Sequence, residues 1–236
     1  MLDVHAPHGN AHTWKDFFIH IATITIGLLI AIGLEQTVEY VHHSHQATLM
    51  AEKLRAEGVE NREISRRDIA ACNAKLATLR EVAASLDDFL RSGGRMPWIP
   101  PAITTDHFYA PSDAVWMMLR DSALLQFMPR LLVENYWKIA VSRDFARSLG
   151  SETIRGRLHL NSLVSVYAGT SSLSRTDATA LRLALAEYTE QLLTFREMLA
   201  RVRASNKVAL ENQVISPESI EAAVEESDIL PEPGAK

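Results

Sequence analysis

The feature that most constrains this chain is an uncharged apolar run near its N-terminus, residues 17–34, with the sequence FFIHIATITIGLLIAIGL. As a helix, this run would be about 27 Å long, close to the thickness of a bilayer hydrocarbon core, roughly 30 Å. Trp14 precedes the run and Tyr40 follows it, where amphipathic rings meet the two membrane interfaces. We therefore predict a short N-terminal tail, residues 1–16, and a transmembrane helix, residues 17–40.

A buried core helix and a cleaved signal peptide are the alternatives for this run. A signal peptide ends its apolar stretch at small residues in an A-x-A-like pattern. Here the run continues into GLEQTVEY, with Glu35 and Glu39 at the place of cleavage. An uncleaved anchor is the better interpretation.

The orientation of this anchor depends on few charges. Lys15 is the only lysine or arginine before the run, and Lys53 is the first one after it. With Lys15 and the terminal amine inside, the positive-inside rule places the bulk of the chain outside the cytoplasm. We expect a single-pass protein of the cell membrane with an extracytoplasmic (periplasmic) body.

One face of the predicted span carries small and polar residues at steps of three or four, which form one stripe on a helix. Thr23, Gly27 and Ala31 follow a small-xxx-small pattern that lets membrane helices approach closely, and polar groups near the ends can pair across the contact. Small residues are common in any membrane helix, so the pattern alone is a weak signal. Besides the lipid bilayer, we predict as partner either a second copy or another membrane protein, contacted through His20, Thr23, Gly27, Ala31 and Glu35.

Beyond residue 41 the pattern is helical, without sustained period-two alternation and without a hairpin signal. We predict an all-α fold in which the transmembrane helix is followed by an antiparallel helical bundle, residues 41–212, with long, partly coiled-coil-like helices. Two apolar seams with steps of three and four support this prediction. The first is Ile69, Cys72, Leu76, Leu79, Ala83, Leu86 and Leu90; the second is Leu181, Leu185, Tyr188, Leu192, Phe195, Leu199, Val202, Asn206 and Ala209. The seams meet either within one chain or between two chains, where Asn206 would help to fix the register.

Glycines, prolines and capping residues predict where the helices end. Ser92-Gly93-Gly94 ends the first seam, and the proline-rich residues 95–111 form an ordered crossing loop. Its aromatic residues, Trp98, Phe108 and Tyr109, are expected to pack over the bundle end.

Further boundaries follow from the same signals. Gly58 predicts a bend in the first long helix, and Ser112-Asp113 starts a new helix. Pro129 starts another helix, which Gly150 closes before Ser151 caps the next one. Residues 213–236 form an acidic C-terminal tail with a short helix between Ser216 and Glu226.

Charge and cysteine content exclude several functional classes. A net charge of -5 and an isoelectric point near 6.0 give no attraction for nucleic acid. The single cysteine, Cys72, excludes an internal disulfide framework, a multi-thiolate zinc site and a cysteine-ligated iron–sulfur cluster. Cys72 lies on the first seam, where we expect it to be buried; the alternative is a cross-link between two copies in a parallel dimer.

Seven of the nine histidines lie within the first 45 residues and flank the apolar run. On a helix, His8 and His12 would share a face, but Pro7 and Gly9 oppose a helix there, and no carboxylate or thiolate completes a ligand set. The chain also lacks a G-x-S-x-G elbow, an H-E-x-x-H motif, a P-loop and a G-x-G-x-x-G motif. We therefore expect no metal, no cofactor and no catalytic activity.

Several short motifs resemble a group of uncharacterised bacterial membrane-anchored proteins. They are the Gly27–Ala31 run, a following helix with Leu54 and Asn61, Trp116, Ser122-Ala123-Leu124 and Tyr136. The chain departs from that group at residues 35–37, where relatives often have Asn-x-Trp. The resemblance implies a single N-terminal span and a helical extracytoplasmic region, and it supplies no activity.

These observations predict a membrane-anchored helical interaction or structural protein, an oligomer or an accessory subunit of a membrane complex. The first alternative is an extracytoplasmic ligand-sensing module. The second is a membrane protein that binds metal through its histidines.

Overall fold

The computed structural model describes residues 14–94, 96–105, 108–167 and 172–226, and this part of the chain is helical without a strand. The prediction of an all-α fold is therefore confirmed. The elements in chain order are α1 (Trp14–Ser92), η1 (Pro101–Thr104), α2 (Ala114–Arg120), η2 (Ala123–Phe127), α3 (Arg130–Tyr167), α4 (Arg175–Leu210) and α5 (Pro217–Glu225). The elements η1 and η2 are short 3-10 helices.

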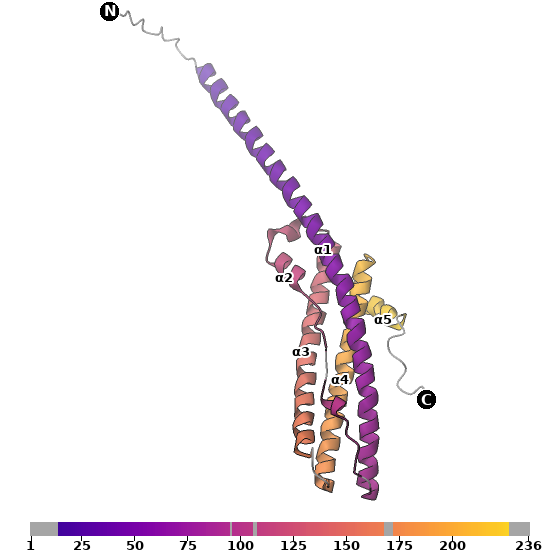
Figure 1. Ribbon diagram of the computed structural model, residues 1–236. Coiled ribbons are helices and arrows are strands. Elements are labelled where there is room, and N and C mark those ends of the chain that lie inside the picture. Colours follow the sequence, from indigo (N-terminus) through magenta and orange to yellow (C-terminus); the bar gives the residue numbers. More distant parts are fainter. Residues whose placement is uncertain (1–13, 95, 106–107, 168–171, 227–236) are drawn as a thin grey trace, which may run out of the picture.

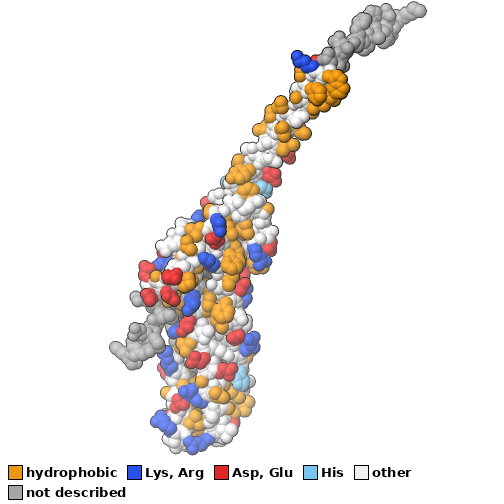
Figure 2. Space-filling view, turned by 180° about the vertical axis from the view of Figure 1, so that it is seen from behind, with side chains coloured by type: hydrophobic (Ala, Val, Ile, Leu, Met, Phe, Trp, Pro, Cys, Tyr) orange, Lys and Arg blue, Asp and Glu red, His pale blue; other side chains and the backbone are white. Residues whose placement is uncertain are grey.

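The longest element, α1, has 79 residues and belongs to two different environments (Figure 1). Its N-terminal part, residues 14–39, projects alone, and exposed hydrophobic side chains lie along it (Figure 2). We call these residues the projecting part of α1. From Ala47 onward one of its faces is buried against the bundle, where α4 lies alongside it and α3 packs on α4. The apolar run and the first bundle helix therefore form one continuous helix.

The two predicted seams meet inside one chain. Leu76 and Leu79 on α1 and Leu185 and Leu192 on α4 are all buried in the same apolar cluster. Contacts between the two helices join Leu90 to Arg175, Asp87 to Arg182 and Asn73 to Arg196, so residue numbers fall along α1 as they rise along α4.

Cys72 is fully buried in this same cluster, as predicted. A cross-link between two copies through Cys72 would require the cluster to open. Asn206, the polar residue of the second seam, is buried as well. Its side-chain amide donates to Val202 O on its own helix, at 2.8 Å.

A second buried cluster lies nearer to the projecting part of α1. It contains Ala47, Ala51, Leu54, Trp116, Leu119, Met128, Leu132, Tyr136, Ile139, Ala140, Ala204, Val208, Ala209, Ile215 and Ala223. All five helices and the segment before α5 contribute to it. The short helix predicted near the C-terminus is confirmed as α5, which Ser216 caps and which packs against α4.

The predicted helix end at Gly150 is wrong, because α3 runs through Gly150 and Ser151 as one helix. α1 runs through Gly58 as one unbroken helix, and the bend expected there stays a prediction. Both glycines instead lie at close contacts: a Cβ at Gly58 would lie 2.8 Å from Tyr136 Oη, and one at Gly150 would lie 3.2 Å from the Phe195 ring. The predicted stop after Ser92 is confirmed, with Gly93 in the left-handed region at φ 66°.

The crossing segment, defined as the described residues 96–105 and 108–113, runs back along the bundle from the end of α1 toward α2 (Figure 1). The predicted packing of its aromatic residues is wrong for Trp98 and Tyr109, which are 58% and 64% exposed. Phe108 does pack inward, with its ring edge-to-face against Phe195 at 5.4 Å. Position along the segment alone did not distinguish the inward ring from the outward ones.

Candidate functional site

The projecting part of α1 holds the residues that the sequence singled out for helix packing: His20, Thr23, Gly27, Ala31 and Glu35. All five are exposed, and no other part of the described chain lies within 4 Å of a Cβ built on Gly27. The hydroxyl of Thr23 donates to Ile19 O at 2.8 Å, which satisfies it within the helix. In the described residues, α1 is the one helix that is long and apolar enough to cross a membrane.

The stripe faces away from the bundle. Gly27 precedes the buried Ala47 by twenty residues, which is about five and a half turns of an α-helix. The two residues therefore point to nearly opposite sides of α1. Gly33 precedes Ala47 by fourteen residues, about four turns, so Gly33 lies on the bundle side. A partner could approach the stripe without meeting the bundle.

The buried face of α1 contains a polar series that sequence reasoning missed. Glu57, Asn61 and Asp68 are at most 8% exposed, and each one accepts a hydrogen bond from a backbone N–H of the segment opposite. Val115 N donates to Glu57 at 2.9 Å, Ser112 N donates to Asn61 at 2.7 Å, and Tyr109 N donates to Asp68 at 3.0 Å. The series fastens the crossing segment and the start of α2 to α1.

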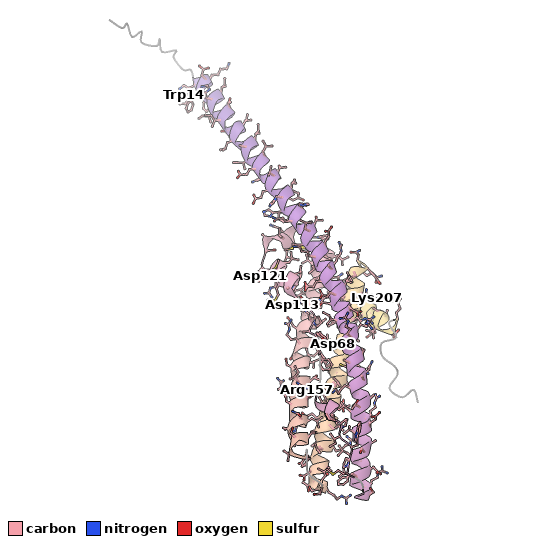
Figure 3. The ribbon with its side chains drawn as sticks, in the orientation of Figure 1. Trp14, Asp68, Asp113, Asp121, Arg157 and Lys207 are labelled. Atoms are coloured by element: carbon pink, nitrogen blue, oxygen red, sulfur yellow. The ribbon has the colours of Figure 1, made fainter. Side chains whose placement is uncertain are left out.

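Two arginines of α3 complete this attachment from the opposite side. Arg143 is buried and donates to Ser112 O at 2.6 Å, and Asn61 donates to the same carbonyl at 2.9 Å. Arg147 donates to Asp113 at 2.8 Å, and Arg143 lies 3.7 Å from that carboxylate. The arginine side chains lower the pKa of Asp113 against the opposing effect of burial. We call these residues the polar layer: Glu57, Asn61 and Asp68 of α1, Asp113 of the crossing segment, and Arg143 and Arg147 of α3. Figure 3 labels Asp68 and Asp113 within it.

Asp68 is the member of the series whose pKa is shifted by burial. Burial raises its pKa from 3.8 to about 6, and the hydrogen bond from Tyr109 N opposes this shift. The folded state thus binds a proton at Asp68 at a higher pH than the unfolded chain does. The contribution of Asp68 to stability therefore increases as the pH falls from about 7 to about 4.

We expect the substitution Asp68→Asn to raise the free energy of unfolding at pH 7.5 by about 1–2 kcal/mol. The full difference in pKa corresponds to about 3 kcal/mol, and the lost second acceptor of Tyr109 N offsets part of it. Urea unfolding of both proteins at pH 4.5 and 7.5 measures the effect. The increase in the free energy of unfolding caused by Asp68→Asn should be smaller at pH 4.5 than at pH 7.5. An equal increase at both pH values would contradict the assignment to Asp68 ionisation.

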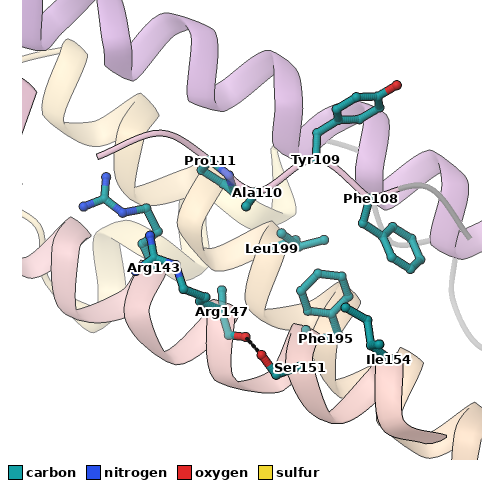
Figure 4. A pocket seen from close by; sticks show the side chains of 12 residues that line it. Phe108, Tyr109, Ala110, Pro111, Arg143, Arg147, Ser151, Ile154, Phe195 and Leu199 are labelled. Atoms are coloured by element: carbon teal, nitrogen blue, oxygen red, sulfur yellow. Dashed lines mark hydrogen bonds between the residues drawn. The ribbon is translucent and has the colours of Figure 1, made fainter. Parts of the chain in front are cut away.

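A cavity of about 170 Å³ lies between the crossing segment, α3 and α4 (Figure 4). Its inner wall consists of Phe108, Phe195 and Leu199, and Ile154, which is 48% exposed, borders the opening. The other lining residues are Tyr109, Ala110, Pro111, Arg143, Ala146, Arg147, Gly150 and Ser151. The cavity therefore borders directly on the polar layer but is itself apolar.

The histidines of α1 do not come together as a ligand set. His42 bonds to Gln46 at 2.9 Å, and His43 stacks on Phe127 and lies 3.5 Å from Glu39. Within the described ranges, no group of three or more histidine, cysteine or acidic residues is placed to hold a metal ion. The N-terminal histidines, His5, His8 and His12, lie outside the described residues.

No family model, no curated protein and no solved structure matches this chain. A functional assignment therefore depends on three features: the outward stripe of α1, the polar layer that fastens the crossing segment, and the cavity beside that layer. Of these, sequence reasoning identified the stripe.

Proposed function

We propose that this chain is a single-pass membrane anchor that holds an antiparallel, partly coiled-coil-like bundle at the extracytoplasmic face and acts by association, without catalysis. The stripe of α1 is the contact, and a second copy of the chain is its partner. The observation that carries the proposal is the position of the stripe on the side of α1 that faces away from the bundle.

Two copies related by a twofold axis along α1 would place their bundles on opposite outer sides. Gly27 and Ala31 would let the helices approach closely, and His20 and Glu35 would lie within the contact near its ends. The same outward side of α1 continues beyond the apolar run with Val38, which is 70% exposed. An apolar contact could therefore extend from the membrane into the region where the bundle begins.

The matched test compares Gly27→Ile with Gly33→Ile. Both glycines lie in the apolar run, and a Cβ built on either one meets nothing within 4 Å beyond the local helix backbone. They differ in the side of α1 that they occupy. We expect Gly27→Ile to weaken self-association in lipid nanodiscs or native membranes at least tenfold, measured by energy transfer between labelled copies, and Gly33→Ile to leave it within twofold.

Equal effects of the two substitutions would contradict the assignment of the stripe as the contact. If the protein is monomeric in native membranes but cross-links to a different membrane protein through position 27, the chain is an accessory subunit and the partner is not a second copy. An orientation reporter fused after Lys236 tests the topology. A cytoplasmic signal there would overturn the extracytoplasmic placement.

Two other functions remain as competing proposals. A histidine-based metal protein would lose bound metal when His5, His8 and His12 are replaced by alanine, which elemental analysis can measure. An extracytoplasmic ligand-sensing module requires a binding site in the bundle. The resemblance to bacterial membrane-anchored proteins is compatible with each of these functions and selects none.

A further inference from the structure

The cavity between the crossing segment, α3 and α4 has the size of a single aromatic ring. Its volume is about 170 Å³. An engineered cavity of about 150 Å³, lined by leucine, isoleucine and phenylalanine, binds benzene. A molecule with one ring and one small substituent would therefore fill this cavity, whereas a bilayer lipid would not fit.

The inner wall suits an aromatic ligand. Phe108 and Phe195 meet edge-to-face, with ring centroids 5.4 Å apart and an angle of 70° between the rings. Leu199 is buried beneath them, and Ile154 borders the opening. A third ring placed between these side chains would gain the edge-to-face and apolar contacts that aromatic groups prefer.

The charges around the cavity select against a cationic ligand. Arg143 donates to Ser112 O, and Arg147 donates to Asp113 and Asp144. Both guanidinium groups point away from Phe195 and Leu199 (Figure 4). Arg143 Nε is buried without a hydrogen-bond partner, and the positive charge of both groups disfavours a cation nearby.

One polar atom at the rim can orient an uncharged ligand. The hydroxyl of Ser151 lines the cavity and donates to Arg147 O at 3.0 Å. Its own lone pairs can therefore accept a hydrogen bond from a ligand hydroxyl. An aromatic alcohol matches both the apolar wall and this rim.

The outer wall of the cavity is held in place by the polar series on α1. Asp68 binds Tyr109 N and Asn61 binds Ser112 N, on either side of Ala110 and Pro111. The segment that covers the cavity is thus fixed at both ends. A fixed wall reduces the ordering that a ligand would otherwise have to impose when it binds.

From these observations we propose that this cavity is a binding site for a small, uncharged aromatic molecule of the phenol class. This site lies in the bundle, away from the stripe of α1, and it does not depend on self-association. It would give the bundle a sensory function in addition to an anchoring function.

The test uses phenol as the probe and the full chain in lipid nanodiscs, with isoleucine methyl groups labelled for NMR. Ile154 reports on the cavity, and Ile24, exposed on the projecting part of α1, reports on phenol that partitions into lipid. We expect a saturable shift of the Ile154 methyl signal, with a Kd of about 0.1–1 mM. We expect no saturation at Ile24. A non-saturating response at Ile154 that parallels that of Ile24 would overturn the proposal.

Two substitutions change the cavity in opposite directions. Gly150→Ala adds a methyl group 3.2 Å from the Phe195 ring and suits the interior of α3, so it should keep the fold and weaken phenol binding at least about fivefold. Leu199→Ala enlarges the cavity, so it should shift the preference from phenol to the larger indole by at least about fivefold. Unchanged phenol affinity in Gly150→Ala, or an unchanged phenol-to-indole ratio in folded Leu199→Ala, would place the binding elsewhere and contradict the assignment.

Discussion

Replacement of Gly58 by alanine is expected to lower the free energy of unfolding by about 2 kcal/mol, although alanine favours a helix over glycine by about 1 kcal/mol. A Cβ at position 58 would lie 2.8 Å from Tyr136 Oη and 3.3 Å from Asn206 Oδ1. The Tyr136 hydroxyl donates to Leu54 O at 2.9 Å, and burial raises its pKa to about 12, so it stays protonated as a donor. Displacing it leaves a buried hydroxyl without a partner. Urea unfolding at neutral pH measures the loss.

A double-substitution cycle identifies the cause of this loss. Tyr136→Phe removes the atom that the new methyl group would meet, so Gly58→Ala should cost at least about 1 kcal/mol less in that background. Gly33→Ala is the matched control, because Gly33 lies outside the proposed contact and its built Cβ meets nothing within 4 Å beyond the local helix backbone. If Gly58→Ala costs the same with and without the Tyr136 hydroxyl, the contact is not what requires glycine.

Gly58 and Gly150 also show why some of the fold could not be predicted from the sequence. A lone glycine in a helical pattern costs only about 1 kcal/mol relative to alanine, which burial of the surrounding helix easily offsets. Both glycines therefore lie inside long helices, α1 and α3, and leave room for Tyr136 Oη and the Phe195 ring. The sequence contains the glycine but not the side chain that approaches it from another helix.

The apolar seams could be predicted because their signal is local. Leu76 and Leu79 on α1 and Leu185 and Leu192 on α4 follow the three- and four-residue steps that place side chains on one helix face. The polar series Glu57, Asn61 and Asp68 continues the same buried face of α1 toward the N-terminus. It was missed because charged and amide residues on helices are usually solvated. The missed signal was their spacing of four and seven residues, which places them on one helix face directly upstream of the Ile69 seam.

The cavity could not be predicted at all, since it needs three distant segments. Phe108 comes from the crossing segment, Ile154 from α3 and Phe195 from α4. Phe195 belongs to a predicted seam, whereas nothing in the residues around Phe108 indicates which of the three loop aromatics points inward. The polar layer determines which aromatic ring points inward, because it fixes Tyr109 N and Ser112 N against α1.

Asn61→Ala is expected to release part of the crossing segment and to lower the free energy of unfolding by about 3 kcal/mol. The Asn61 amide is 2% exposed; it accepts from Ser112 N at 2.7 Å and donates to Ser112 O at 2.9 Å. Alanine leaves Ser112 N buried without this acceptor, while Ser112 O keeps Arg143 as a donor. Hydrogen exchange of the backbone amides of Tyr109, Ser112 and Val115 measures the local release.

Asn61→Asp separates the two hydrogen bonds. A carboxylate at position 61 still accepts from Ser112 N but cannot donate to Ser112 O, so its Ser112 amide should exchange more slowly than that of Asn61→Ala. Asn73→Ala is the matched control on α1, because Asn73 is half-buried and accepts a side-chain hydrogen bond from Arg196 at 3.1 Å. It should leave exchange at Ser112 unchanged. Asn61→Ala with wild-type exchange at Ser112 would mean that Arg143 and the neighbouring contacts of Asp68 and Glu57 hold the segment without Asn61.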